Sequence, residues 1–209
     1  MTTSLRYIHL KGLNYVQIEI YSSQLTKNWR LKYLTIELHT ERLYLRTMNA
    51  SDSPSLFKIW SDPDVTKFLN ISSFTYEEQA KEIFALLGEL ARDNIASNFT
   101  IIERESNEII GTCGFNSIDF ENSKVEIGVS IAKAYWGKGY ASEGINALVN
   151  YAFQTLNLNR IEAKVEPANV NSIKVLTKLN FTFEGTLRQY EKSKGNLIDI
   201  NMYSRLRTD

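Results

Sequence analysis

The segment Lys124-Val-Glu-Ile-Gly-Val-Ser-Ile-Ala-Lys-Ala-Tyr-Trp-Gly-Lys-Gly-Tyr-Ala141 decides the fold of this chain. Its first eight residues alternate apolar and polar side chains, which predicts a strand with one buried face. The other face carries a carboxylate, a bare backbone position and a hydroxyl from Glu126 to Ser130, a polar row that suits a cleft. Gly137 and Gly139 then precede an amphipathic stretch. We therefore expect a strand, a glycine turn and a helix in that order.

A glycine turn that opens a helix presents unpaired backbone N–H groups at the positive end of the helix dipole, and phosphate is their natural guest. A tight turn that only needs positive φ is the alternative. A Walker A loop would need glycine at Ala132 and Ser or Thr at Gly139. A Rossmann fingerprint would need a third glycine at Ser142. Neither nucleotide-binding motif fits this segment.

Outside this segment the chain alternates between strand-like and helix-like patterns. Alternation predicts strands over 40–48, 99–103, 108–117, 160–165, 181–188 and 198–203. Helical spacing predicts helices over 51–60, from the capping box at 75–78 to residue 90, and over 171–179, and places residues 145, 148, 149 and 152 on a buried helix face. The three runs between 99 and 131 are separated by short polar turns. They predict an antiparallel meander.

Length and composition favour one catalytic domain of an ordinary globular protein. The chain has 209 residues, and its 24 basic residues equal its 24 acidic residues, so it lacks the basic surface that nucleic-acid binding needs. Its single cysteine, Cys113, excludes a disulfide within the chain and a multi-cysteine metal site, and neither histidine has metal-ligand spacing, so we expect no metal. No apolar run is long enough to span a bilayer. We expect a cytoplasmic protein with no membrane partner.

The first 35 residues differ from the rest. They carry five basic residues against one acid, Glu19, and the alternating run Tyr15–Tyr21 suggests a strand. A basic arm for an acidic partner is one interpretation. A loosely attached extension, or a mis-assigned translation start, is the preferred one. We therefore divide the chain into an extension over 1–35 and a catalytic domain over 36–209.

The segment Trp136-Gly-Lys-Gly-Tyr-Ala141 resembles the acetyl-CoA signature of the GNAT superfamily of acetyltransferases, (Gln/Arg)-x-x-Gly-x-(Gly/Ala). Trp136 departs from the usual Gln or Arg, but the longer phrase from Tyr135 to Glu143 resembles the RimJ/RimL-like branch. The segments 40–46, 125–128, 169–172 and 178–181 resemble further conserved blocks of that branch. The resemblance covers roughly residues 36 to 205.

The resemblance implies an α+β fold, the GNAT fold, with a mixed, mostly antiparallel central sheet of about six to seven strands flanked by helices. It also implies that acetyl-CoA, as cosubstrate, lies in a cleft between splayed central strands. The residues implied to bind CoA are Val129, Ile131, Trp136, Gly137, Lys138, Gly139, Tyr140, Ala141, Ser142 and Asn169. Among them, the backbone of Val129 or Ile131 would also supply an N–H for the oxyanion. Lys138 would screen the phosphates, unless it is simply a solvated lysine.

Acetyl transfer to an amine needs a base, and a carboxylate is sufficient for an α-amine. By resemblance Glu191 is the first candidate, and Glu126, on the polar face of the strand before the glycine turn, is the second. Ser172 would protonate the departing thiolate, or would only begin a helix. Glutamates are usually solvated surface groups, and that interpretation stays open for both. Cys113 is expected to be a small buried thiol, with an acetyl-cysteine relay a minor alternative.

The branch resemblance implies that the acceptor is a primary amine, namely the N-terminal α-amine of a protein, perhaps ribosomal in origin. Two alternatives stay open: a small-molecule amine such as a polyamine, amino acid or aminoglycoside, and a non-catalytic acyl-CoA-binding module. The sequence does not separate a monomer from a homodimer.

Overall fold

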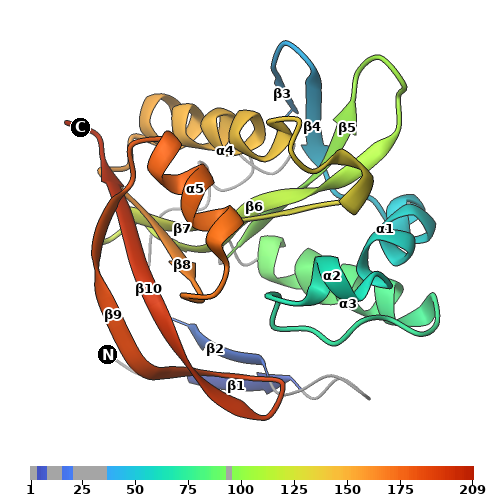
Figure 1. The fold of residues 1–209 in the computed structure, drawn as a ribbon, viewed down its shortest axis with the longest axis horizontal. Helices are drawn as coiled ribbons and strands as arrows, with labels where there is room; N and C mark the ends of the chain where they lie inside the picture. Colours follow the sequence, from blue (N-terminus) through green and yellow to red (C-terminus); the bar gives the residue numbers. More distant parts are fainter. Residues whose placement is uncertain (1–3, 9–15, 21–36, 93–95) are drawn as a thin grey trace.

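The computed structural model describes residues 4–8, 16–20, 37–92 and 96–209 (Figure 1). Within these residues the main sheet has eight strands in the order β3-β4-β5-β6-β7-β8-β10-β9. The strands are β3 (Glu37–His39), β4 (Leu43–Thr47), β5 (Ser97–Glu103), β6 (Ile109–Asp119), β7 (Lys124–Ile131), β8 (Arg160–Val165), β9 (Thr182–Ser193) and β10 (Asn196–Leu206). This is the predicted α+β architecture. The count exceeds the expected six to seven because β3, at three residues, is too short to show alternation.

The helices are α1 (Ser53–Trp60), α2 (Pro63–Thr66), α3 (Glu78–Arg92), α4 (Tyr140–Asn150) and α5 (Val170–Lys178). A π-helical segment, Tyr151–Thr155, continues α4, and short 3-10 turns precede α1 and α4. Figure 1 shows α4 and α5 together over one part of the sheet, and α1, α2 and α3 grouped elsewhere. The strand, turn and helix predicted over 124–141 are confirmed as β7, the turn and α4.

All neighbouring strands of the main sheet pair antiparallel except β7 and β8, which are parallel. The predicted meander is thus confirmed as β5, β6 and β7. A parallel pair needs a crossover connection, and α4 with its π-helical extension provides it. The chain therefore runs from the end of β7 through the glycine turn into α4 before it returns to the sheet as β8.

Two hydrophobic clusters hold these elements. The larger one packs α4 onto the sheet, and the helix residues predicted to be buried, Ile145, Leu148, Val149 and Ala152, are between 0% and 3% exposed. The smaller one joins α1, α2 and α3 around Leu56, Trp60, Phe74 and Ile83, among others. The larger cluster includes residues of both β7 and β8, such as Val125 and Ile161. The burial follows from the helical spacing of apolar residues in the sequence.

Several predicted boundaries shift in the structure. The strand expected over 40–48 begins only at Leu43, because Thr40 accepts and donates hydrogen bonds that close a turn on Leu43. β9 and β10 are longer than their predicted ranges 181–188 and 198–203, because they pair as a long hairpin whose exposed residues show no clean alternation. The capping box expected at 75–78 is wrong in its partner, since Gln79, and not Glu78, accepts from the Thr75 N–H at 2.8 Å.

The N-terminal region contains β1 (Ser4–Ile8) and β2 (Val16–Ile20), which form a separate antiparallel sheet of two strands. The strand predicted over 15–21 corresponds to β2, while its end residues, 15 and 21, lie outside the described residues. Among the helices that the structure describes, none combines the length and apolar character that crossing a bilayer requires.

Candidate active site

Strands β7 and β8 separate soon after they begin. Their paired residues run only from Lys124↔Arg160 to Glu126↔Glu162. Beyond this point β7 keeps its partner β6, since the Ala132 N–H donates to the Ile110 carbonyl at 2.8 Å. Backbone groups alternate sides along a strand, so Val129 and Ile131 direct their N–H and C=O groups toward the side that β8 has left. This splay provides an open backbone edge suited to the amides of a pantetheine chain.

The glycine turn lies where β7 ends. Gly137 and Gly139 both have left-handed backbones, with φ of 75° and 86°. Gly139 is the N-cap of α4, and no side chain caps the helix there. Tyr140, Ala141 and Ser142 form the first turn, whose N–H groups are therefore presented to an anionic guest. The position of these residues fits the pyrophosphate of CoA.

Trp136, the departure from the family signature, ties the turn to the end of β7. Its Nε1–H donates to the Ile131 carbonyl at 2.7 Å, and the residue as a whole is 42% exposed. Lys138 places its Nζ 5.0 Å from the centroid of the Tyr135 ring, so its ammonium group is held near the turn.

Sequence reasoning missed a network of hydrogen bonds that joins Thr40 and Arg42 to α4 and to the glycine turn. The Glu143 carboxylate, in α4, accepts from the Thr40 hydroxyl at 2.6 Å and from the Arg42 N–H at 2.9 Å. The Arg42 side chain pairs with the same carboxylate at 2.6 Å and also donates to the Lys138 carbonyl at 3.0 Å. Burial raises the pKa of Glu143, but the bonds from Thr40 and Arg42 outweigh it and hold the pKa below its usual value. The sequence signals were two resemblances to conserved segments of the branch, at 40–46 and from Tyr135 to Glu143.

Ser172 and Asn169 begin α5. The Ser172 N–H donates to Asn169 Oδ1 at 3.2 Å, so Asn169 is the N-cap and Ser172 lies in the first turn. The helix-capping interpretation of this segment is therefore confirmed. The contacts expected with the pantetheine and with the thiolate remain predictions.

The two candidate bases converge on one residue that the sequence did not single out, Lys164 of β8. Its Nζ lies 3.1 Å from Glu126 Oε2 and 3.2 Å from Glu191 Oε1. Asn116 of β6 donates to the other Glu126 oxygen at 3.3 Å. Asn116 also fills the space over Gly128, where an added Cβ would lie 2.8 Å from its side chain. The structure thus groups both carboxylates on one face, beside the point where β7 and β8 separate.

One polar atom near this point has no partner. The Ser130 Oγ, on the same β7 face as Glu126, is buried and makes no hydrogen bond within the described part of the chain. A buried hydroxyl without a partner costs free energy, and a bound polar group would relieve that cost. The orphaned hydroxyl, the open strand edge and the glycine turn all fit a CoA thioester lying along β7.

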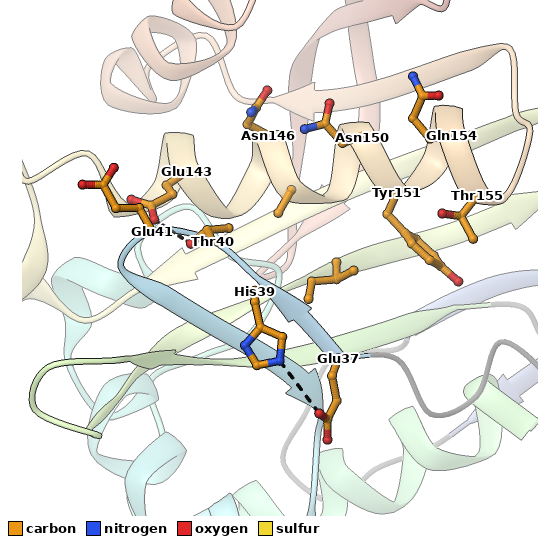
Figure 2. Close-up of a pocket in the computed structure, with 12 residues that line it drawn as sticks. Glu37, His39, Thr40, Glu41, Glu143, Asn146, Asn150, Tyr151, Gln154 and Thr155 are labelled. Atoms are coloured by element: carbon orange, nitrogen blue, oxygen red, sulfur yellow. Dashed lines mark hydrogen bonds and ion pairs between the residues drawn. The ribbon is translucent and has the colours of Figure 1, made fainter.

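A pocket of about 650 Å³ lies elsewhere, between β3 and the side of α4 (Figure 2). Figure 2 shows Asn146, Asn150 and Gln154 along the helical segment and Glu37 and His39 on the strand side. None of the residues predicted to bind CoA or to act in catalysis lines this pocket. The pocket is therefore separate from the β7–β8 splay, beside which Glu126, Lys164 and Glu191 meet.

Cys113 lies on β6, where it pairs in register with Val129 of β7. Cys113 is 2% exposed in the core, and burial raises the pKa of its thiol, which confirms the expected small buried thiol. Within the residues that the structure describes, no three metal-ligating side chains come together.

Comparison with known proteins agrees with this geometry. The family described as "Acetyltransferase (GNAT) domain" matches residues 42–182. The uncharacterized N-acetyltransferase p20 of Bacillus licheniformis is 51% identical over 172 residues, which span 82% of this chain and 97% of p20.

Two solved structures share the fold. An acetyltransferase of the GNAT family from Bacillus anthracis has a TM-score of 0.74 at 28% identity, with 83% of this chain and 100% of that chain covered. An acetyl transferase from Salmonella typhimurium, described as modifying the N-terminal serine of the ribosomal protein L7/L12, has a TM-score of 0.71 at 26% identity. That match covers 80% of this chain and 96% of the Salmonella chain.

Proposed function

Because the chain belongs to the GNAT family of acetyltransferases and is an acetyl-CoA-dependent N-acetyltransferase, we propose that its acceptor is the N-terminal α-amine of a protein. The observation that carries the proposal is the convergence of Glu126 and Glu191 beside the β7–β8 splay. A carboxylate is a weak base, and it suits an α-amine with a pKa of about 8 far better than a lysine amine at about 10.4. Similarity to the Salmonella enzyme supports the same class of acceptor.

The proposed binding mode of acetyl-CoA follows the open backbone of β7. The pantetheine amides bind the backbone of Val129 and Ile131 and the side chain of Asn169. The pyrophosphate binds the N–H groups of the glycine turn and the first turn of α4, which carries the positive end of the helix dipole. Lys138 adds a positive charge beside that turn.

The proposed reaction is a direct attack. The amine transfers a proton to Glu191, and its lone pair forms the C–N bond with the thioester carbonyl carbon. A backbone N–H of Val129 or Ile131 stabilises the oxyanion that develops. The C–S bond then breaks, and Ser172 donates its hydroxyl proton to the thiolate while it takes a proton from solvent. Glu191 releases the proton of the amine to solvent, and the products are the acetylated amine and free CoA. Glu126 is the alternative base, because it lies on the same face.

The proposed acceptor can be tested by measuring CoA release with matched peptides whose N-termini are free or blocked. We expect turnover only of free N-termini, and a loss of about 10²-fold or more in kcat for Glu191→Gln. Ser172→Ala should also slow kcat, with acetyl-CoA binding retained. Glu121→Gln, an exposed position in the turn between β6 and β7, is the control. Equal rates on blocked peptides, or faster rates on small amines, would reject a protein N-terminus as the acceptor.

We also propose that residues 36–209 form the catalytic domain and that residues 1–35 are dispensable for it. The family match begins at residue 42, and every element around the splay lies after residue 36. A variant that starts at residue 36 should bind acetyl-CoA as the full chain does in isothermal titration calorimetry. If the acceptor is ribosomal, the reaction takes place in the cytoplasm.

A further inference from the structure

Lys164 occupies an unusual place in the sheet. Continuing the parallel register past Glu126↔Glu162 would set Lys164 opposite Gly128, in the part where β7 and β8 have separated. We call the place where β7 and β8 separate the fork. The Lys164 side chain is 23% exposed and reaches the carboxylates of Glu126 on β7 and Glu191 on β9. Lysine is seldom buried unless it is paired. The Lys164 ammonium group therefore lies at similar distances, 3.1 and 3.2 Å, from the two candidate bases.

Glu191 reaches this lysine from a distant strand. β9 is separated from β8 by β10, so the two backbones lie roughly 10 Å apart at the usual strand spacing of about 4.8 Å. A bulge in β9 makes the approach possible: Gln189 has a φ of 49°, and its N–H donates to Asp199 Oδ1 at 2.7 Å. The register shifts at the same place. Glu191, which pairs with Ile198, lies directly beyond this irregularity and contacts Lys164.

Other charged groups on this face are engaged separately. Glu162, two residues before Lys164, accepts from Arg160 Nε at 2.8 Å and lies 3.6 Å from Lys124 Nζ. The ring of Tyr190 has its centroid 5.2 Å from Lys164 Nζ, a cation–π contact. Burial lowers the pKa of Lys164, but the two glutamates outweigh it and raise the pKa above its ordinary value. Lys164 therefore stays charged and cannot itself serve as the base.

The two glutamates are not equivalent partners. The Glu126 side chain is 17% exposed and has a second donor in Asn116, while the Glu191 side chain is 33% exposed. Two glutamates and one lysine leave a single negative charge on the cluster, which complements an ammonium group. When Glu191 accepts a proton, Lys164 remains paired with Glu126, so no buried carboxylate is left without a cation.

We propose that Lys164 is a positioning residue of the acetyl-transfer site: it anchors on Glu126 and holds Glu191 at the fork, where Glu191 receives the proton of the incoming amine. The inference rests on the proposed function, since it needs a carboxylate base. It assigns distinct tasks to the two glutamates, with Glu191 as the base and Glu126 as the anchor.

The test compares Lys164→Met, which keeps the length of the side chain without its charge, with Lys164→Arg, which keeps the charge. Lys124→Met is the control, because it removes a lysine of the same face whose ion pair is with Glu162. We measure kcat and KM for the acceptor, the Kd for acetyl-CoA, and the pH dependence of kcat/KM. The acceptor is whichever amine the wild-type protein acetylates fastest, so the outcome does not depend on that amine being a peptide N-terminus.

For Lys164→Met we expect kcat to fall at least 10-fold, with the Kd for acetyl-CoA changed less than about 3-fold. The acidic limb of kcat/KM should move to higher pH, because both carboxylates lose a cation that lies within 3.2 Å of them. Lys164→Arg should restore most of kcat and the limb. An unchanged kcat, or a lower kcat with an unmoved acidic limb, would overturn the proposal. A wild type that acetylates only small amines would reject the proposed acceptor and leave this comparison valid.

Discussion

The network behind the glycine turn predicts a measurable coupling between β4 and α4. Arg42→Ala and Glu143→Ala, alone and together, form a double-mutant cycle on the ion pair at 2.6 Å. The Arg42 side chain is 41% exposed and that of Glu143 is 17% exposed, so the pair lies between a solvent-screened pair, worth about 0.2–1 kcal/mol, and a buried one. We expect a coupling free energy of about 1 kcal/mol. Glu143→Ala alone should cost more, about 2–3 kcal/mol, because the Thr40 hydroxyl and the Arg42 N–H also lose their acceptor.

The assay is urea unfolding followed by tryptophan fluorescence, with Asn146→Ala as the control because Asn146 is exposed on the same helix. Arg42 also donates to the Lys138 carbonyl, so loosening it should disorder the turn that binds CoA. If the disordered turn weakens the binding free energy of acetyl-CoA by about 1 kcal/mol, KM for acetyl-CoA rises about 5-fold. A coupling below about 0.3 kcal/mol, with KM unchanged, would refute the reasoning, because independent sites add within that range.

The remaining predictions concern two glycines, the carboxyl group of Asp52 and the thiol of Cys113. Gly139→Ala should raise KM for acetyl-CoA, since a left-handed backbone at φ 86° costs an L-residue about 1–2 kcal/mol. Gly88→Ala, in a helix with open space around the new methyl group, should instead stabilise the protein by up to about 1 kcal/mol in the same unfolding assay. Burial raises the pKa of Asp52, but Arg46 and further donors outweigh it and hold the pKa below its usual value. Asp52 therefore contributes stability above the unfolded-state pKa of about 3.9 that disappears as pH falls through the lower folded-state pKa, so urea midpoints of wild type and Asp52→Asn should differ at pH 7 and converge in acid. Cys113 should resist iodoacetamide in the native protein and react only after unfolding, as mass spectrometry would show; rapid native labelling would contradict its burial.

Local pattern was sufficient for most elements of this fold. Helical spacing of apolar residues located α1, α3 and α4, and alternation located β5 to β8 with small errors at the ends. β3 was not predicted, because three residues are too few to show an alternation of apolar and polar side chains. β9 and β10 were found but shortened, because a mostly exposed hairpin needs no apolar alternation to form.

The sequence by itself determined the order of strand, glycine turn and helix start, because the alternating strand, the two glycines and the first residues of α4 lie within 18 consecutive residues. Only the tertiary structure decided which charges meet. Lys164 contacts Glu126 and Glu191 from strands that are 38 and 27 residues away along the chain, and Arg42 contacts Glu143 at a separation of 101. Such pairs leave no local period in a single sequence, since their distances are set by sheet order, a bulge and a crossover helix.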